Sequence, residues 1–122
     1  MKKSVKTTSA PVPAGPYSQA IVTEHNIYVA GQGPAAPETG LVPQGIEAQT
    51  RQVLKNIEAI LKAAGSSIEN VVKVSAYLSD MADFEQFNRV YKEFFNEPYP
   101  VRTTVGVQLV NILVEVDVIA VK

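Results

Sequence analysis

Mostly apolar residues recur with a helical period in two segments of the chain. In the first segment the repeat runs mostly at steps of three and four residues, which places these side chains on one face of an α-helix. The members of this stripe are Ile46, Thr50, Val53, Ile57, Ile60, Leu61 and Ala64. Gly65 is expected to end the helix in a left-handed conformation. The second stripe consists of Phe84, Phe87, Val90, Tyr91, Phe94 and Phe95, and Asp80 or Asp83 is its candidate N-cap.

Segments with strand-like alternation surround these two helices. The predicted strands are residues 4–8, 18–23, 27–31, 71–78, 101–107 and 112–121. The second and third should form a hairpin, because Glu24, His25 and Asn26 make a tight turn between them. The order β-β-β-α-β-α-β-β predicts an α+β fold in one domain, residues 1–122, with a six-stranded mixed sheet and two helices on one face. Strand–helix–strand units give parallel neighbours, and hairpins at both ends of the chain give antiparallel pairs.

The last predicted strand has two different faces. Ile112, Val114, Val116, Val118 and Ala120 suit a face covered by helices. The opposite set, Leu113, Glu115, Asp117, Ile119 and Val121, is too apolar for a fully solvated face and yet carries two acids. An uncovered, half-apolar sheet usually finds a partner, so we expect a homo-oligomer whose sheets face one another, with polar pockets at the seams. The alternative is a monomer with a modest exposed patch.

Composition excludes several classes of function. The chain has 122 residues, of which 46% are hydrophobic and 19% charged, and its net charge of −1 offers no electrostatic footprint for nucleic acid. Cysteine is absent, which excludes thiol catalysis and thiolate metal sites and is compatible with the expected cytoplasmic location. No stretch approaches a membrane span. His25 is the only histidine, so no metal site based on histidine is expected.

Arg102 is the most informative candidate for chemistry. It opens an apolar strand, where a guanidinium is costly to desolvate unless it meets an anion such as a carboxylate. Thr104 shares its strand face. If this strand pairs with the last one, Glu115 lies near Arg102 across the ladder. The two residues would then provide a cation that holds an anionic substrate and a carboxylate that activates water. The alternatives are a surface arginine paired with a nearby acid and, for Glu115 and Asp117, an ordinary polar strand face.

Two further residues are candidates for lining a pocket. Tyr17 follows Gly15-Pro16 at the end of a proline-stiffened segment and is well placed to reach into a pocket, although a tyrosine that merely covers the hairpin is common. Gly31 ends a predicted strand where backbone must come close to another group, and the alternative is an ordinary loop glycine. The run Gly31-Gln32-Gly33 lacks the third glycine and the helix start of a dinucleotide-binding fingerprint.

Nearly the whole chain resembles the Rid (YjgF-like) family of reactive imine and enamine deaminases. The matching segments include Gly15-Pro16-Tyr17-Ser18-Gln19-Ala20, Ala30-Gly31-Gln32, Gln49 to Ile57, Ala63-Ala64-Gly65, Val72-Lys73-Val74, Asp83 to Phe95, Pro100-Val101-Arg102 and Val114-Glu115-Val116. The resemblance implies a chorismate-mutase-like fold and a homotrimer with sites at the subunit seams. It also implies hydrolysis of 2-aminoacrylate and 2-iminopropanoate to pyruvate and ammonia without a cofactor.

Carried onto this chain, the resemblance assigns a role to each candidate. Arg102 would clamp the substrate carboxylate, the backbone N–H of Thr104 would add a hydrogen bond to it, and Glu115 would position and polarise the attacking water. Tyr17 would close the pocket from one side of the seam, and backbone near Gly31 would line it.

Three positions depart from the family pattern, and two other functions stay open. Thr104 stands where many members have cysteine, Ala30 stands where many have serine, and the segment 108–112 is shorter than usual, which could shift the register of the last two strands and move Glu115. One alternative is a non-catalytic binder of small carboxylates that needs Arg102 and Tyr17 but not Glu115. The other is an RNA-directed role, against which the near-neutral charge argues.

Overall fold

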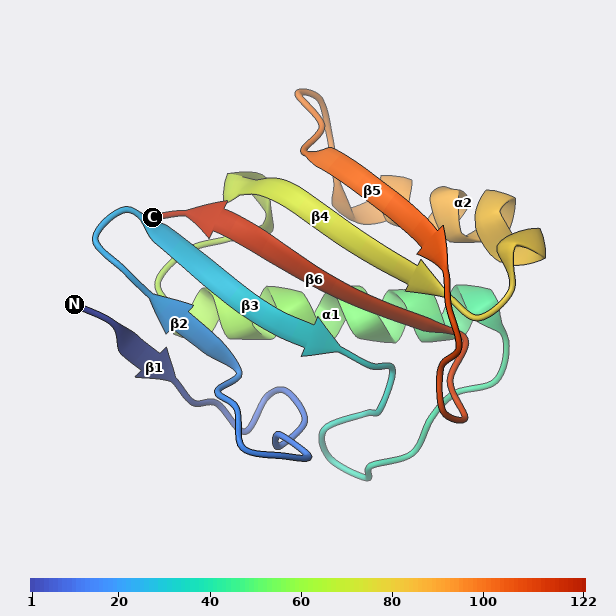
Figure 1. The fold of residues 1–122 in the computed structure, drawn as a ribbon, viewed down its shortest axis with the longest axis horizontal. Coiled ribbons are helices and arrows are strands. Elements are labelled where there is room, and N and C mark those ends of the chain that lie inside the picture. Colours follow the sequence, from blue (N-terminus) through green and yellow to red (C-terminus); the bar gives the residue numbers. More distant parts are fainter.

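The computed structural model describes all 122 residues as one six-stranded sheet with two α-helices packed against it (Figure 1). The strands are β1 (Lys3–Val5), β2 (Ala20–Val22), β3 (Asn26–Gln32), β4 (Val71–Leu78), β5 (Val101–Gly106) and β6 (Val114–Val121). The helices are α1 (Ile46–Ala63) and α2 (Phe84–Phe94), and the short 3-10 turns η1 (Ile68–Asn70) and η2 (Met81–Asp83) precede β4 and α2. Neither α-helix is long and apolar enough to cross a membrane.

The strands lie in the order β1-β2-β3-β6-β4-β5. The predicted hairpin of β2 and β3 is confirmed, and so is the parallel pairing of β4 and β5 across α2. The predicted hairpin of the last two strands is wrong. β6 pairs antiparallel with β3 on one edge and with β4 on the other, so β4 separates it from β5.

Burial explains the central position of β6. Its helix-facing residues Val114, Val116, Val118 and Ala120 are at most 2% exposed, and the residues between them are half-buried. Because both faces of β6 are apolar enough to leave water, a place between two strands removes more of its surface from solvent than an edge would. The short segment 108–112 therefore sets no register between β5 and β6, and Glu115 lies opposite Tyr77 of β4.

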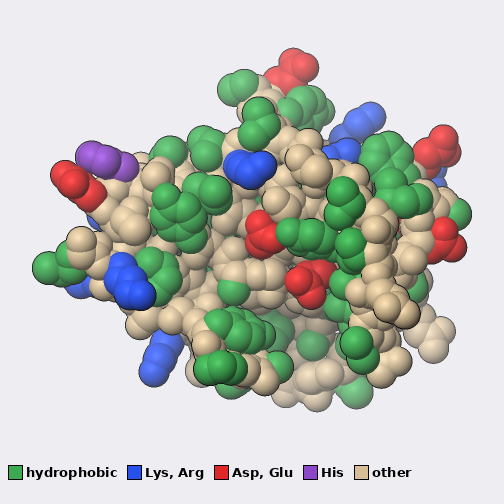
Figure 2. All heavy atoms as spheres, viewed as in Figure 1, with side chains coloured by type: hydrophobic (Ala, Val, Ile, Leu, Met, Phe, Trp, Pro, Cys, Tyr) green, Lys and Arg blue, Asp and Glu red, His purple; other side chains and the backbone are tan.

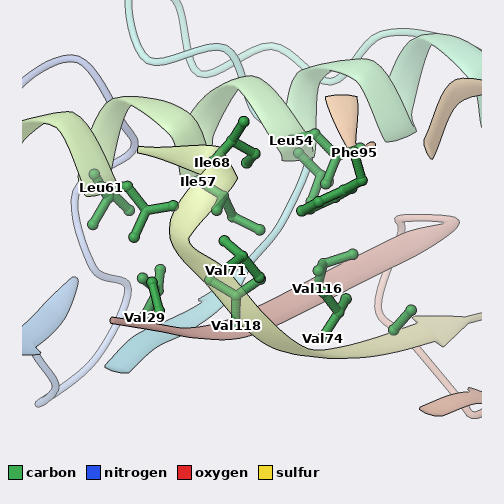
Figure 3. Close-up of a cluster of buried hydrophobic side chains, with 14 of the residues drawn as sticks. Val29, Leu54, Ile57, Leu61, Ile68, Val71, Val74, Phe95, Val116 and Val118 are labelled. Carbon is green, nitrogen blue, oxygen red and sulfur yellow. The ribbon is translucent and has the colours of Figure 1, made fainter. Parts of the chain in front are cut away.

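The core lies between the sheet and the helices, both of which cover the same face, as predicted (Figure 1). The stripe of α1 is buried as expected, and Figure 3 shows Leu54, Ile57 and Leu61 pointing from the helix toward the sheet, where Val116 and Val118 of β6 lie. Gly65 adopts φ 83°, the left-handed conformation that the sequence predicted for the end of this helix.

The second helix starts through an intermediate turn. The Asp80 side chain accepts a hydrogen bond of 2.9 Å from the Ala82 N–H and so caps η2, whereas Asp83, the residue before α2, makes no such bond with its side chain. A bidentate ion pair between Arg51 of α1 and Glu93 of α2, with N–O distances of 3.0 and 2.8 Å, links the two helices at the surface. The two helices are thereby tied to each other as well as to the sheet.

The opposite face of the sheet carries no helix. On it the apolar side chains of Tyr28, Val101 and Val105 are 43, 66 and 39% exposed. Figure 2 views this face, on which acidic side chains near the middle are surrounded by apolar ones. An apolar surface of this kind, rimmed by polar groups, is typical of an interaction site. We refer to it below as the open face.

Tyr91 of α2 closes the core beside β5. Its ring stacks on Phe95 with 4.4 Å between the centroids, and its hydroxyl is buried without a hydrogen-bond partner. Burial raises the pKa of Tyr91 above its ordinary value of 10.0, and the nearby Arg102 guanidinium opposes this shift. Folding therefore favours the neutral phenol.

We expect Tyr91→Phe to keep the free energy of unfolding at neutral pH or to raise it by up to about 1 kcal/mol, because the lost hydroxyl has no partner. Above pH 10 the parent should lose stability more steeply than the variant. A group whose pKa is raised by folding stabilises the folded protein fully at pH values below its unfolded pKa. This stabilisation disappears as the pH rises through the pKa of the folded state. Urea unfolding from neutral pH to about pH 11 measures both effects. The exposed Tyr99→Phe is the matched control, and a large loss at neutral pH would contradict the expectation.

Candidate functional site

Arg102 lies on the edge strand β5 and points to the helix side of the sheet. It is in register with the buried Val74 of β4, whose side chain faces the core. Its guanidinium carbon stands over three rings of the α2 region, with centroid distances of 4.7 Å to Tyr91, 5.3 Å to Phe87 and 5.7 Å to Phe84. Cation–π attraction of this kind holds a guanidinium in place without consuming its N–H donors.

No carboxylate of the chain neutralises Arg102. The three ion pairs of the structure join His25 to Glu24, Arg51 to Glu93 and Arg89 to Glu47. The half-buried Arg102 is therefore oriented by rings alone, and its planar fork stays available for a bidentate contact with an anion.

A hollow of about 440 Å³ opens beside this guanidinium. It is lined by Asn88, Tyr91, Lys92, Tyr99, Pro100 and Arg102. Thr104 is half-buried two residues further along β5, on the same helix-facing side as Arg102 and in register with the buried Ala76. The prediction that Arg102 and Thr104 share a face is confirmed. This hollow has two cations and no acid on its walls, which suits an anionic ligand.

Glu115 projects from the open face, on the other side of the sheet. It lies opposite Tyr77, and its carboxylate sits directly above the backbone of Gly31. A Cβ added at Gly31 would stand 2.5 Å from Glu115 Oε2, so a side chain at this position would displace the Glu115 carboxylate. The close approach arises in an irregularity of the β3–β6 ladder between Val29 and Gln32, where β3 carries an extra residue as in a β-bulge. The interpretation of Gly31 as a point of close backbone approach is supported.

Tyr17 lies next to Gly31. Both residues line a hollow of about 230 Å³, together with residues of the 11–14 and 32–35 segments. The Tyr17 hydroxyl accepts a hydrogen bond of 3.2 Å from the Ala14 N–H, and Gln19 holds the preceding segment through bonds to Thr7 and Pro11. The tyrosine is half exposed, so its ring is anchored at the hydroxyl and open to a ligand or to another chain.

The two acids of the open face have different surroundings. The Tyr77 hydroxyl donates a hydrogen bond of 3.1 Å to Asp117. Burial, followed by this bond, raises the pKa of Tyr77. Glu115 has no hydrogen bond or ion pair with another side chain. Asp117 is therefore engaged within the sheet, whereas the Glu115 carboxylate is free to accept a proton or a hydrogen bond.

The predicted site residues thus fall into two groups. Glu115 lies against Gly31, which shares a hollow with Tyr17, and Arg102 and Thr104 come together at the edge strand on the helix side. The expectation that Glu115 lies near Arg102 across the ladder is wrong, because β4 stands between their strands and the two side chains leave opposite faces of the sheet. The Arg102 group can hold an anion and the Glu115 group can take up a proton. Within a single chain these two groups do not form one site.

Sequence reasoning missed part of the Arg102 group. The apolar stripe predicted only that Tyr91 is a core residue, and in the structure it is both a core residue and a wall of the hollow beside Arg102. Asn88 and Tyr99 were not singled out. Nothing in the stripe distinguishes a ring that supports a cation from one that packs only on carbon. The predicted parallel pairing of β5 with β4 was the available signal, because it places Arg102 beneath α2. No three metal-ligating side chains gather anywhere in the chain.

Comparison with known proteins shows the family to which the chain belongs. A sequence profile of the family described as endoribonuclease L-PSP matches residues 7–122. A RutC family protein of Pyrococcus horikoshii is 49% identical, covering 100% of this chain and 99% of the relative. The 2-iminobutanoate/2-iminopropanoate deaminase of Mus musculus is 42% identical over 100% of this chain and 93% of its own.

Solved structures share the fold. The crystal structure of Escherichia coli TdcF with bound serine has a TM-score of 0.93 and 36% identity, covering 98% of each chain. These matches extend over the whole sheet, both helices and both residue groups described above. The α+β architecture inferred from the sequence is that of solved Rid proteins, and the chain belongs to the Rid family, whose members also bear the names YjgF and RutC.

Proposed function

We propose that this protein hydrolyses 2-imino acids and their enamine tautomers, such as 2-iminopropanoate and 2-aminoacrylate, to 2-keto acids and ammonia. The observation that carries the proposal is the lone Arg102 guanidinium beside a hollow without acids, which suits a small carboxylate. The printed name of the mouse relative, an iminobutanoate and iminopropanoate deaminase, supports this substrate class. So does the serine bound to TdcF, since serine carries the same α-carboxylate.

The proposed mechanism requires little from the protein. Arg102 holds the substrate carboxylate, and the Thr104 N–H adds a hydrogen bond to it. Glu115 orients a water molecule and accepts its proton as the oxygen adds to the imine carbon, which is already electrophilic. The resulting carbinolamine expels ammonia and leaves the keto acid. Holding substrate and water together supplies the main advantage, which is proximity. Tyr17 closes the pocket, and no cofactor takes part.

The opposite-face placement of the two groups supports a site shared between chains. We propose that copies of this chain assemble through their open faces as a homotrimer, so that Arg102 and Thr104 of one copy meet Tyr17, Gly31 and Glu115 of the next. The exposed apolar residues of the open face support such an assembly. A head-to-tail contact that closes into a ring gives every site the same composition.

The alternative functions receive less support. A binder of carboxylates would need Arg102 and Tyr17 alone, but it gives no reason for a free carboxylate held close above the backbone of Gly31. An RNA-directed activity conflicts with the acids Glu115 and Asp117 in the middle of the open face, because carboxylates repel phosphates. We propose a cytoplasmic location, where enamines released by amino-acid dehydratases form.

The parent protein, added to a serine or threonine dehydratase, should speed keto acid release. Arg102→Ala should lower kcat/KM on the order of 100-fold, since a bidentate bond to a charged group contributes about 3 kcal/mol. Keto acid is measured by reduction with lactate dehydrogenase. Arg89→Ala, which removes an exposed arginine paired with Glu47, is the control. A parent without effect on the rate would refute the deaminase, and an Arg102→Ala variant as active as the parent would refute the role of Arg102.

Gly31→Ala should fold and lose most of its turnover. Its Cβ would displace the flexible Glu115 carboxylate, and misplacing a catalytic group by about 1 Å costs up to about 100-fold. Gly33→Ala is a matched control, because a Cβ there meets only Ile112 at an ordinary 3.6 Å. Circular dichroism checks the fold and the coupled assay checks the rate. Equal activity of the two variants would contradict the close contact of Gly31 with a working Glu115.

Mixing two inactive variants tests the shared site. Arg102→Ala and Glu115→Gln chains, denatured together in equal amounts and refolded, should regain about a quarter of the parental activity, because one site in four then combines an intact arginine with an intact glutamate. If both residues acted within one chain, no mixed assembly would contain an intact site and activity would stay at the level of the single variants. Each variant refolded alone is the control.

A further inference from the structure

Helix α1 carries buried polar side chains that the proposed mechanism does not use. Gln49 and Asn56, which belong to the Gln49–Ile57 segment noted in the sequence, are 6% and 1% exposed. A buried amide is costly unless every donor and acceptor has a partner. Gln49 bonds to backbone groups of Pro43 and Leu113, and Asn56 bonds to the Gly33 and Ala35 carbonyls and to the Gln52 side chain, so that both amides reach the loops around Glu115 and Gly31.

Gln49 joins two loops that lead to the site. Its Oε1 accepts a hydrogen bond of 2.8 Å from the Leu113 N–H, and its Nε2 donates one of 3.0 Å to the Pro43 carbonyl. Leu113 is also held on its other side, because its carbonyl accepts a 3.0 Å bond from the Ser79 N–H. Both the N–H and the carbonyl of Leu113 are therefore held by hydrogen bonds just before β6 begins.

Leu113 lies just outside β6, two residues before Glu115, and its side chain packs against the core while its backbone leads directly into the strand. The preceding segment 108–112 is irregular, and Asn111 in it has φ 60°, so this segment alone gives β6 no defined starting point. The bond from Gln49 supplies that starting point. It is formed 64 residues away in sequence, from a helix that is anchored by its own apolar stripe.

Asn56 fixes the facing wall in the same way. Its Nδ2 donates hydrogen bonds of 3.0 Å to the Gly33 and Ala35 carbonyls, just beyond Gly31, and its Oδ1 accepts one from Gln52. Gly31 and Glu115 lie so close that small shifts of either would change the carboxylate position. One rigid helix thus holds the backbone on both sides of this contact.

We propose that Gln49 is a positioning residue, which places the Glu115 carboxylate against Gly31 by fixing the Leu113 backbone. The inference rests on the proposed function of Glu115. It predicts an effect on turnover that exceeds any effect on substrate binding, because Arg102, which holds the substrate, lies on a different face. A merely structural amide would lower stability and leave both kinetic constants of the folded protein unchanged.

Gln49→Met keeps the size of the side chain and removes both hydrogen bonds. We expect kcat to fall at least about tenfold, with KM within about twofold of the parent. Ile60→Val, which weakens the same helix inside the core, is the matched control and should change neither constant. Circular dichroism and urea unfolding identify conditions in which all three proteins are fully folded.

Gln49→Glu provides a conservative rescue that depends on pH. The neutral carboxylic acid reproduces both bonds, since its carbonyl oxygen accepts from Leu113 and its O–H donates to Pro43. Burial raises the pKa of such a carboxyl. The kcat of this variant relative to the parent should therefore be near one at low pH and fall about tenfold as the pH rises through that pKa. The parent measured at each pH removes the titration of Glu115 itself from the comparison.

The outcomes separate the two proposals. An inactive parent overturns the deaminase, and the positioning of Glu115 is then read from its ¹³C-labelled carboxyl resonance, whose chemical shift at neutral pH should change in Gln49→Met and not in Ile60→Val. With an active parent, unchanged kcat in Gln49→Met, or a flat pH ratio in Gln49→Glu, overturns the inference. If Gln49→Met does not fold, the pH ratio of Gln49→Glu decides.

Discussion

The placement of β6 between β3 and β4 is the constraint from which the other features follow. It puts the valines of β6 under α1 and fills the core, and it turns Glu115 to the face that carries no helix. It also leaves β5 at the edge with Arg102 turned under α2. Cation and carboxylate are therefore kept apart within one chain by the same ladder that stabilises the fold. This separation prevents them from neutralising each other.

The surroundings of Arg102 solve a problem that any receptor for small acids must solve. A guanidinium needs fixed orientation, yet a carboxylate partner would compete with the ligand. Three aromatic rings provide orientation through contact with the faces of the π-systems, and they leave the N–H groups unpaired. The phenol of Tyr91 extends this arrangement, because burial keeps it neutral and so avoids a competing charge. The hollow nearby then remains free of acids.

Much of the fold followed from periodicity. The two helical stripes, the left-handed Gly65 and the alternation of the last strand are local features, and each was predicted from the residues that carry it. The order of the strands in the sheet does not follow from such local patterns. The insertion of β6 between β3 and β4, instead of beside β5, depends on how all six strands divide the buried area, and no residue between 107 and 113 encodes it. The proximity of Arg102 and Glu115 within a chain was consequently expected and is wrong. The contact of Gly31 with another group was anticipated from its type, although the partner, Glu115, became evident only from the ladder.

The irregularity in β3 has one more consequence. The side chains of Ile27 and Val29, two odd-numbered residues, face the core. After the extra residue, the next side chain that turns inward belongs to the even-numbered Gln32. The alternation of inward and outward side chains along β3 therefore shifts by one residue across Gly31. Removing a single residue there would restore simple alternation with the glutamine still turned inward, and it would abolish the extra residue at which the backbone of Gly31 meets the Glu115 carboxylate. Change in length during evolution is consequently restricted at this strand, and in the loop that follows it is best tolerated at the exposed residues 38–42, between the Ala35 and Pro43 carbonyls that α1 holds.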